Sequence, residues 1–144
     1  MSSKIIQVET SIKERYLVKG KARKHEVWID QPENGGGQDK GPTPIEYFLL
    51  GLSGCLLAIA RILAKQKRIQ LRGMDIRVEG DLDSDFLLGK STQGRAGLTE
   101  IRLTAKMDAD LTPEQKEDFL NEMDRRCPVT ENVRNATPIR LKLE

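Results

Sequence analysis

The pattern of hydrophobic and polar positions is clearest between Ile45 and Leu63, where apolar residues recur at every third or fourth position. This spacing places them along one face of an α-helix. The start of the helix is well marked, because Thr43 can cap it, Pro44 suits its first position, and Glu46 completes a capping box with Thr43. We expect the helix to end near residue 68, where cations face the negative end of its dipole.

Two rows of side chains on this helix predict different kinds of contact. The first is an apolar stripe, which we expect to be buried and which includes Cys55. The second row, Gly51, Gly54 and Ala58, carries very small side chains, although Gly costs about 1 kcal/mol relative to Ala inside a helix. A close approach by a second helix explains it, and since the chain offers no obvious partner we expect an obligate homodimer. The apolar stripe comprises Ile45, Phe48, Leu52, Cys55, Ile59 and Ile62.

Short alternating segments on both sides of the helix predict strands. Between them, Gly, Pro and Asn are so dense over residues 30–42 that this stretch must be a loop, while the connection 83–97 is longer than a hairpin turn. Capping signals predict a further helix at 113–125, and Cys127-Pro128 starts a short turn or helix that runs to residue 134. The strands are expected at 5–8, 15–18 and 26–29, with a turn at 19–21; at 71–82 and 98–107, which should pair; and at 139–143, which closes the fold.

These elements follow the order β-β-β-α-β-β-α-β and predict an α+β protein of two layers around a long apolar central helix. A length of 144 residues with 38% hydrophobic side chains suits a single domain over residues 1–144. Lys plus Arg number 24 against 22 for Asp plus Glu, with no polybasic tract, so we expect no nucleic-acid partner. Glu46, Ser53 and Arg61 interrupt the apolar stretch, which argues against a membrane span. The start lacks a secretory signal, and we expect a cytoplasmic protein.

Candidate chemistry rests on two cysteines, because a single His and the lack of a CxxC pair make a metal site improbable. Cys55, on the apolar stripe, could be no more than a small hydrophobic residue filling space. Cys127 precedes Pro128 at the start of a short helix, where free N–H groups favour a thiolate. Arg125 and Arg126 could add to that effect or remain solvated. Neither position by itself identifies a reaction.

Two segments together resemble the OsmC/Ohr family of osmotically inducible and organic hydroperoxide resistance proteins. They are Gly-Gly-Gly-Gln-Asp-Lys-Gly-Pro-Thr-Pro-Ile-Glu-Tyr-Phe-Leu-Leu-Gly-Leu-Ser-Gly-Cys, ending at Cys55, and Arg126-Cys127-Pro128-Val129. The resemblance extends over residues 24–144 and is nearest to the OsmC-like branch. It implies an intertwined homodimer of two-layer subunits, with two active sites at the interface and thiol-dependent reduction of peroxides.

By position, the resemblance makes Cys55 the peroxidatic cysteine and Cys127 the resolving one. A sulfenic acid on Cys55 would condense with Cys127 to a disulfide, which an external dithiol must reduce, with no bound cofactor. The family activates the first cysteine with an Arg that a Glu at the helix start holds. Arg23 is our nominee for that Arg, with Arg15 second. Glu46 stands one place later than the Glu of the Ohr branch, a rotation of about 100° on a helix, so it either holds the Arg or only caps the helix.

Three functions therefore remain open. The first is a thiol peroxidase that reduces organic hydroperoxides in oxidative-stress defence. The alternative is a non-catalytic dimer that binds a small hydrophobic or thiol-bearing ligand around Cys55. The third is a structural dimer whose cysteines are inert.

Overall fold

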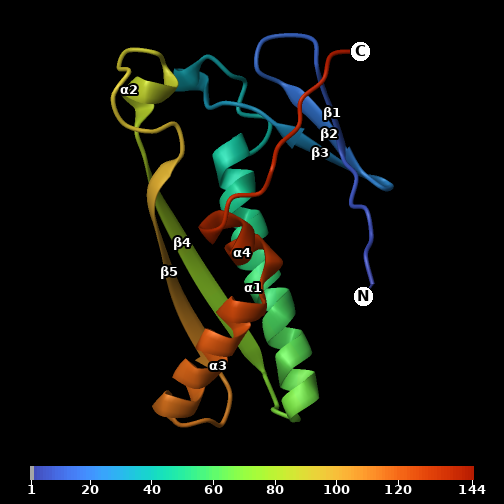
Figure 1. Ribbon diagram of the computed structural model, residues 1–144, viewed down its shortest axis with the longest axis vertical. Coiled ribbons are helices and arrows are strands. Elements are labelled where there is room, and N and C mark those ends of the chain that lie inside the picture. Colours follow the sequence, from blue (N-terminus) through green and yellow to red (C-terminus); the bar gives the residue numbers. More distant parts are fainter. Residues whose placement is uncertain (1) are drawn as a thin grey trace. The chain divides into compact units, whose positions relative to one another are not determined.

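The computed structural model describes residues 2–144 and confirms a mixed α+β fold (Figure 1). The chain forms two compact units, one up to Phe48 and one from Leu49 to Glu144, and each is described by itself. The prediction of a single domain over 1–144 stays a prediction. The elements are β1 (Glu9–Ile12), β2 (Val18–Ala22), β3 (His25–Ile29), the 3-10 turn η1 (Glu33–Gly35), α1 (Pro44–Lys67), β4 (Gly73–Leu82), α2 (Ser84–Leu87), β5 (Leu98–Asp108), α3 (Pro113–Arg126) and α4 (Pro128–Arg134).

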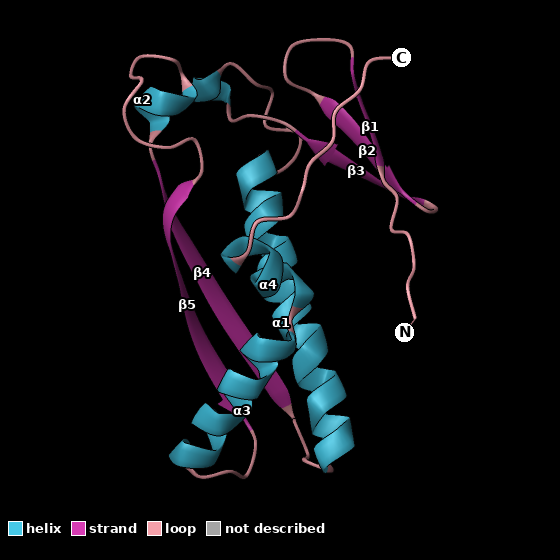
Figure 2. Ribbon diagram, in the orientation of Figure 1, coloured by secondary structure: helices cyan, strands magenta, loops and turns pink. Residues whose placement is uncertain are grey.

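The first unit contains an antiparallel sheet in the order β1-β2-β3, as the opening strands predict (Figure 2). Three details of the prediction are wrong. The first strand lies four residues later than expected, and the strand expected at 15–18 is mostly a turn, since β2 begins only at Val18. Residues 19–21 belong to β2 instead of forming a turn. Gly20 is small because it packs in the sheet: a Cβ there would lie 2.9 Å from Val27 Cγ2. The turn falls at Arg23, which adopts a left-handed φ of 55°.

One buried carboxylate orders the loop that follows β3. Asp30 is 1% exposed, and its oxygens accept the backbone N–H groups of Gln31, Gln38 and Lys40 at 2.8, 3.2 and 3.1 Å. Burial opposes ionisation of Asp30, but these three donors and the charge of Arg15 outweigh it and lower the pKa of the carboxyl. The side chain therefore holds a long glycine-rich segment in one conformation.

Close backbone contacts in the same loop explain its glycines. A Cβ on Gly37 would lie 2.0 Å from the carbonyl oxygen of Gln31, and one on Gly41 would lie 2.1 Å from that of Trp28. No other residue fits at either position without moving the backbone. Arg15 also stabilises this loop, because its guanidinium donates hydrogen bonds to the carbonyls of both Gly36 and Gly37.

The second unit is built on a long ribbon of β4 and β5, which pair antiparallel as predicted. In Figure 1 the ribbon runs beside α1, with α3 and α4 packed on the same helix. Met74 pairs with Met107 at one end of the ribbon, and a register shift at Asp81 and Leu82 ends the regular pairing at the other. The core is made of Leu52, Leu56, Ala60, Leu63 and Ala64 of α1, with Leu71, Met107, Ala109, Phe119, Met123 and Cys127.

The buried face of α1 differs from the predicted stripe. Leu52 is buried as expected, Cys55 and Ile59 lie at the margin of the core, and Ile45, Phe48 and Ile62 are exposed. The helix is apolar around most of its circumference, so spacing alone cannot select one face. Contact with the ribbon and with α3 selects the row that contains Ala60 and Leu63. The expectation that Cys55 is buried therefore holds only in part.

The predicted closing strand is also absent from the described chain. Residues 136–144 have no regular structure, and the side chains of Ile139, Leu141 and Leu143 are 85%, 95% and 100% exposed. Alternation shows that a segment suits a sheet with one buried face, but a strand forms only beside another strand. Within residues 2–144 no strand pairs with this segment.

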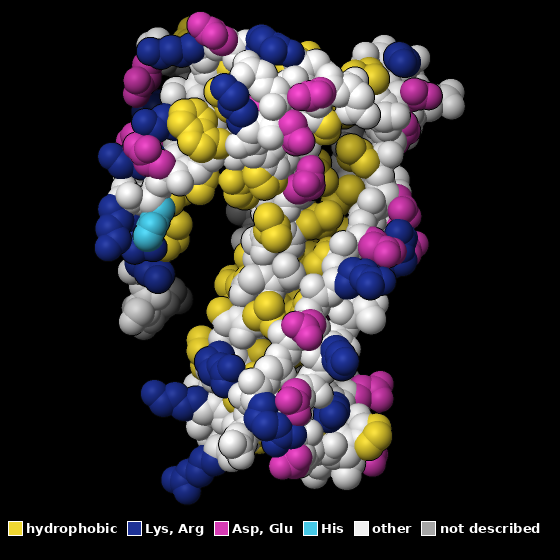
Figure 3. All heavy atoms as spheres, turned by 180° about the vertical axis from the view of Figure 1, so that it is seen from behind, with side chains coloured by type: hydrophobic (Ala, Val, Ile, Leu, Met, Phe, Trp, Pro, Cys, Tyr) yellow, Lys and Arg dark blue, Asp and Glu magenta, His cyan; other side chains and the backbone are white. Residues whose placement is uncertain are grey.

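Exposed apolar side chains also lie along α1. Leu50 and Ile62 are 57% and 45% exposed, and Figure 3 shows hydrophobic side chains open along the middle of the face it draws. By length and composition alone, α1 is the one helix within residues 2–144 that could cross a membrane, a test that core helices of soluble proteins also meet. The expectation of no membrane span stays a prediction.

Asp30→Asn is expected to lower the free energy of unfolding at neutral pH, because the charge that three N–H groups solvate is lost. The folded protein holds the carboxyl pKa below its unfolded value, so the charged form stabilises the fold at pH values above the unfolded pKa. This contribution disappears as the pH falls through the folded pKa. The gap between the two proteins should therefore close on acidification, in urea unfolding measured over a pH series.

Asp39→Asn is the control, because Asp39 lies exposed in the same loop with a left-handed φ of 52°, which Asn tolerates well. It should leave stability nearly unchanged. A loss in Asp30→Asn that is the same at every pH would contradict the electrostatic role of the carboxylate.

Candidate active site

The first candidate residue, Cys55, lies on α1 at the margin of the core of the second unit. Its side chain is partly buried and free of any disulfide. Its neighbour Gly54 leaves open space, because a Cβ there would meet no described atom within 4 Å. The sulfur is therefore held on a rigid helix and is only partly covered.

The second candidate, Cys127, joins two helices and has no exposed surface. Its backbone N–H closes α3 by donating to the carbonyl of Asp124 at 3.2 Å. Its sulfur opens α4 by accepting the backbone N–H of Thr130 at 3.4 Å. Cys127 is thus the last cap of one helix and the first cap of the next, as its position before Pro128 suggests.

The fold brings these two sulfurs together at the start of α4, although they lie far apart in the sequence. The thiol of Cys55 and the sulfur of Cys127 lie near enough for each to shift the pKa of the other, and the N–H of Val129 lowers the pKa of both. Pro128 explains this arrangement, because it starts the helix without an N–H of its own. The next two N–H groups have no helical acceptor and are available to the sulfurs.

The two thiols are electrostatically unequal. Burial raises the pKa of Cys55, the neighbouring Cys127 raises it further, and the Val129 N–H offsets only part of the shift. Burial also opposes ionisation of Cys127, but the hydroxyl and N–H of Thr130, the thiol of Cys55 and the Val129 N–H together lower its pKa. Of the two thiols, Cys127 is therefore the easier to ionise.

The two arginines next to Cys127 take no part in this stabilisation. Arg126 donates to Gln66 Oε1 at 2.9 Å and lies 3.9 Å from a carboxylate oxygen of Glu122. The charge of Arg125 helps to lower the pKa of that same carboxyl. Within residues 2–144 the groups that lower the pKa of Cys127 are uncharged donors.

Glu46 forms the capping box that the sequence predicts. Its N–H donates to Thr43 Oγ1 at 3.2 Å, while the N–H and the hydroxyl of Thr43 donate to Glu46 Oε1 at 3.3 and 2.8 Å. This confirms the capping role at the start of α1. A catalytic role for Glu46 stays a prediction.

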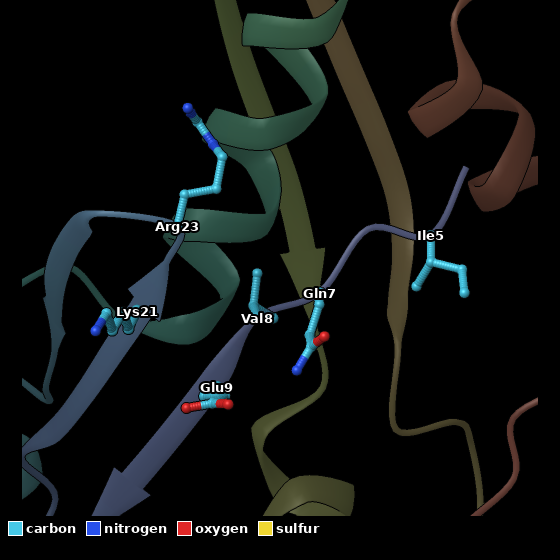
Figure 4. Close-up of a pocket in the computed structure, with 6 residues that line it drawn as sticks. All are labelled: Ile5, Gln7, Val8, Glu9, Lys21 and Arg23. Carbon is cyan, nitrogen blue, oxygen red and sulfur yellow. The ribbon is translucent and has the colours of Figure 1, made fainter.

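Arg23 lies in the turn between β2 and β3 of the first unit, and its catalytic role also stays a prediction. It lines a hollow of about 390 Å³. Its side chain extends away from those of Lys21 and Glu9 (Figure 4). Arg15, the second nominee, is instead engaged by the carbonyls of the glycine-rich loop. The residues around the hollow are Ile5, Gln7, Val8, Glu9, Lys21 and Arg23.

Sequence analysis missed two contributors to the site, Val129 and Thr130. The N–H of Val129 leaves no trace in the sequence, because any residue except proline supplies one. Thr130 does leave a signal: it stands three residues after a cysteine that precedes Pro, the spacing at which a cap meets the third residue of a helix.

These observations define a mixed α+β protein with two neighbouring cysteines, one on its long helix and one before a proline. The model of the OsmC-like protein family matches residues 37–142, and the chain belongs to that family.

Individual relatives agree with this assignment. The chain is 26% identical over 106 residues to a hydroperoxide reductase of Mycoplasma genitalium, covering 74% of this chain and 72% of that one. Its fold is similar to that of an OsmC-like protein of Mycoplasma pneumoniae, with a TM-score of 0.81, 22% identity, and coverage of 94% and 91% of the two chains. The organic hydroperoxide resistance protein OsmC of Legionella pneumophila gives a TM-score of 0.69 at 16% identity, with coverage of 93% and 92%.

Single-cysteine variants separate the two ionisations. In Cys55→Ser the remaining Cys127 should ionise below the ordinary pKa of a thiol, because its Thr130 and Val129 donors persist. In Cys127→Ser the remaining Cys55 should ionise above that value, because burial is the main cause of its shift. Ultraviolet absorbance of the thiolate, followed over a pH titration, measures both, and the reverse order would contradict the site as described.

Proposed function

We propose that this protein is a cysteine-based thiol peroxidase that reduces organic hydroperoxides. The observation that supports the proposal best is the proximity of the two free sulfurs of Cys55 and Cys127, one on a rigid helix and one at a chain turn. Such a pair can take two electrons from a peroxide and store the result as a disulfide. The relatives named as hydroperoxide reductases support the same chemistry.

In the proposed reaction Cys55 attacks first, since Cys127 is fully covered and Cys55 is not. The Cys55 thiolate attacks the distal peroxide oxygen, the O–O bond breaks, and the alkoxide leaves and takes a proton to become an alcohol. Cys55 is then a sulfenic acid. The substrate loses one oxygen and the sulfur gains it, so the step balances.

The second step uses Cys127. Its thiolate attacks the Cys55 sulfur, the S–O bond breaks, and hydroxide leaves as water with a proton from the site. The disulfide that results is reduced by an external dithiol, so the cycle needs no bound cofactor. The lowered pKa of Cys127 supports this role, because a larger fraction of the attacking thiol is ionised at a given pH.

Cys55 needs help to ionise, because burial raises its pKa. We propose that Arg23 supplies the cation, as the family resemblance implies, and that Glu46 orients it in addition to capping α1. A positive charge near a buried thiol favours its thiolate form. The hydrogen bonds of Arg15 to the loop carbonyls favour Arg23 over Arg15.

We also propose that the working unit is an intertwined homodimer in the cytoplasm, with no nucleic-acid or membrane partner. Two features support a second copy. A Cβ at Gly51 or Gly54 meets no described atom within 4 Å, so this row is open along α1. Residues 139–143 carry an exposed alternating pattern with no strand beside them in the described chain. A second copy can cover both.

One observation favours the alternative, a non-catalytic dimer that holds a small hydrophobic or thiol-bearing ligand around Cys55. A thiol whose pKa burial has raised is a poor nucleophile unless a cation reaches it. The two functions differ in a simple measurement, because only the peroxidase consumes peroxide.

Thiol titration tests the peroxidase. One equivalent of cumene hydroperoxide should remove two free thiols per chain from the reduced protein, and a dithiol should restore both. Cys55→Ser should abolish peroxide consumption. Cys127→Ser should react once and leave a sulfenic acid on Cys55 that a dimedone reagent traps and excess peroxide overoxidises.

Two results would count against this assignment. A dimedone adduct on Cys127 in Cys55→Ser would reverse the roles of the cysteines. A native protein that keeps both thiols in the presence of peroxide would instead support the ligand-binding alternative.

Gly54→Leu tests the homodimer. If helices of two copies meet at this row, the larger side chain overpacks the contact, a change that typically costs about 1–3 kcal/mol. Sedimentation should then show weaker association than in the native protein. In a monomer the same change would leave sedimentation unaltered and stabilise the helix by up to about 1 kcal/mol, since Gly is a poor helix former. Glu117→Leu, on the exposed side of α3, controls for the added surface leucine.

A further inference from the structure

The hydroxyl of Thr130 is a buried polar group. The residue is 6% exposed, and within residues 2–144 its Oγ1 makes no hydrogen bond of good geometry, although it lies near enough to Cys127 to help lower the pKa of that thiol. Buried hydroxyls are normally paired, because an unpaired one loses its hydrogen bond to water without compensation. An unpaired hydroxyl in a folded protein therefore calls for an acceptor that arises in some other state of the site.

The acceptor within reach is the sulfur of Cys127, which already receives the backbone N–H of Thr130 at 3.4 Å. A neutral thiol is a weak acceptor, whereas a thiolate is a strong one. The hydroxyl can thus turn toward the sulfur when it carries charge. One residue then supplies two donors, N–H and O–H, to the same sulfur.

The two sulfurs also differ in their exposure to solvent. Cys127 has no exposed surface, whereas Cys55 lies at the margin of the core beside Gly54, where a Cβ would meet no described atom within 4 Å. In thiol–disulfide exchange an incoming thiolate needs access to one sulfur, and the other sulfur must leave as a thiolate. Access favours attack on Cys55, and the donors at the start of α4 favour departure of Cys127.

We propose that Thr130 is a positioning residue that receives the charge of the departing Cys127, so that an external thiol opens the Cys55–Cys127 disulfide by attacking Cys55. The inference rests on the proposed function in that it assumes the disulfide forms during turnover. The reductant is a small dithiol. Its first thiolate bonds to the Cys55 sulfur, the S–S bond breaks, and its electron pair goes to Cys127.

The second thiol of the reductant completes the exchange. Once ionised, it attacks the sulfur of the reductant in the mixed disulfide, and Cys55 leaves and takes up a proton. The reductant departs as a disulfide, and the protein has gained two electrons. The charge that Cys127 receives on leaving lies beside the donors of Thr130 and Val129.

The test begins with the native protein, oxidised by diamide so that it does not depend on peroxide. Brief exposure to a monothiol such as 2-mercaptoethanol, an acid quench, alkylation and peptide mass spectrometry should find the mixed disulfide on Cys55 and the alkyl group on Cys127. The opposite labelling would overturn the proposal. So would a failure of diamide to form the disulfide.

Variants at Thr130 then isolate the hydroxyl. Thr130→Val keeps the shape and the N–H but removes the O–H, and should slow reduction of the disulfide roughly three- to tenfold. In a Cys55→Ser background the same change should raise the pKa of Cys127. Thr130→Ser should restore both, while Thr104→Val, on the exposed side of β5, should change neither. A native reduction rate in Thr130→Val would overturn the role of the hydroxyl.

The two proposals can fail separately. A protein that passes these tests but leaves cumene hydroperoxide intact refutes the peroxidase and upholds the direction of exchange. If Thr130→Val does not fold, Thr130→Ala removes the same hydroxyl and should slow reduction in the same way, while the labelling of the native protein still tests the direction of exchange.

Discussion

Packing of one face of α1 against the β4–β5 ribbon and α3 is the constraint on which the second unit depends. It fixes Ala60 and Leu63 in the core, and it thereby turns Cys55 to the edge of that core instead of its centre. The chain after α3 must then return to the same helix, and it does so at Cys127. Proximity of the two sulfurs is thus a result of helix packing, with no contribution from a disulfide in this structure.

The sequence is informative wherever local chemistry decides the structure. Capping residues place the starts of α1 and α3, and Pro128 places the start of α4, all within a residue or so. Paired alternation identifies the β4–β5 ribbon. The sequence does not predict features that depend on packing between distant segments. It does not show which side of α1 is buried, because the helix is apolar all round, or that Gly20 packs inside a strand. It also does not show whether residues 139–143 form a strand, because that needs a neighbouring strand.

The candidate site shows the same division. Residue types and spacing identify Cys55 and Cys127, and the cap formed by Glu46 follows from a local pattern. The order of the two pKa values does not follow, because it depends on which N–H groups α4 leaves unpaired and on where Thr130 points. The sequence left two orientations open for Arg125 and Arg126, and packing decides between them, since Arg126 turns to Gln66.

Cys127 serves as the final cap of α3 and the first cap of α4, so its sulfur is a structural element as well as a chemical one. A thiolate is a strong acceptor for the Thr130 N–H, and a disulfide sulfur is a weak one. The seven-residue helix α4 is too short to persist on its own backbone bonds. If the proposed disulfide forms, the fraying of α4 depends on the oxidation state of the pair, and amide hydrogen exchange in Pro128–Arg134 reports that state from the backbone.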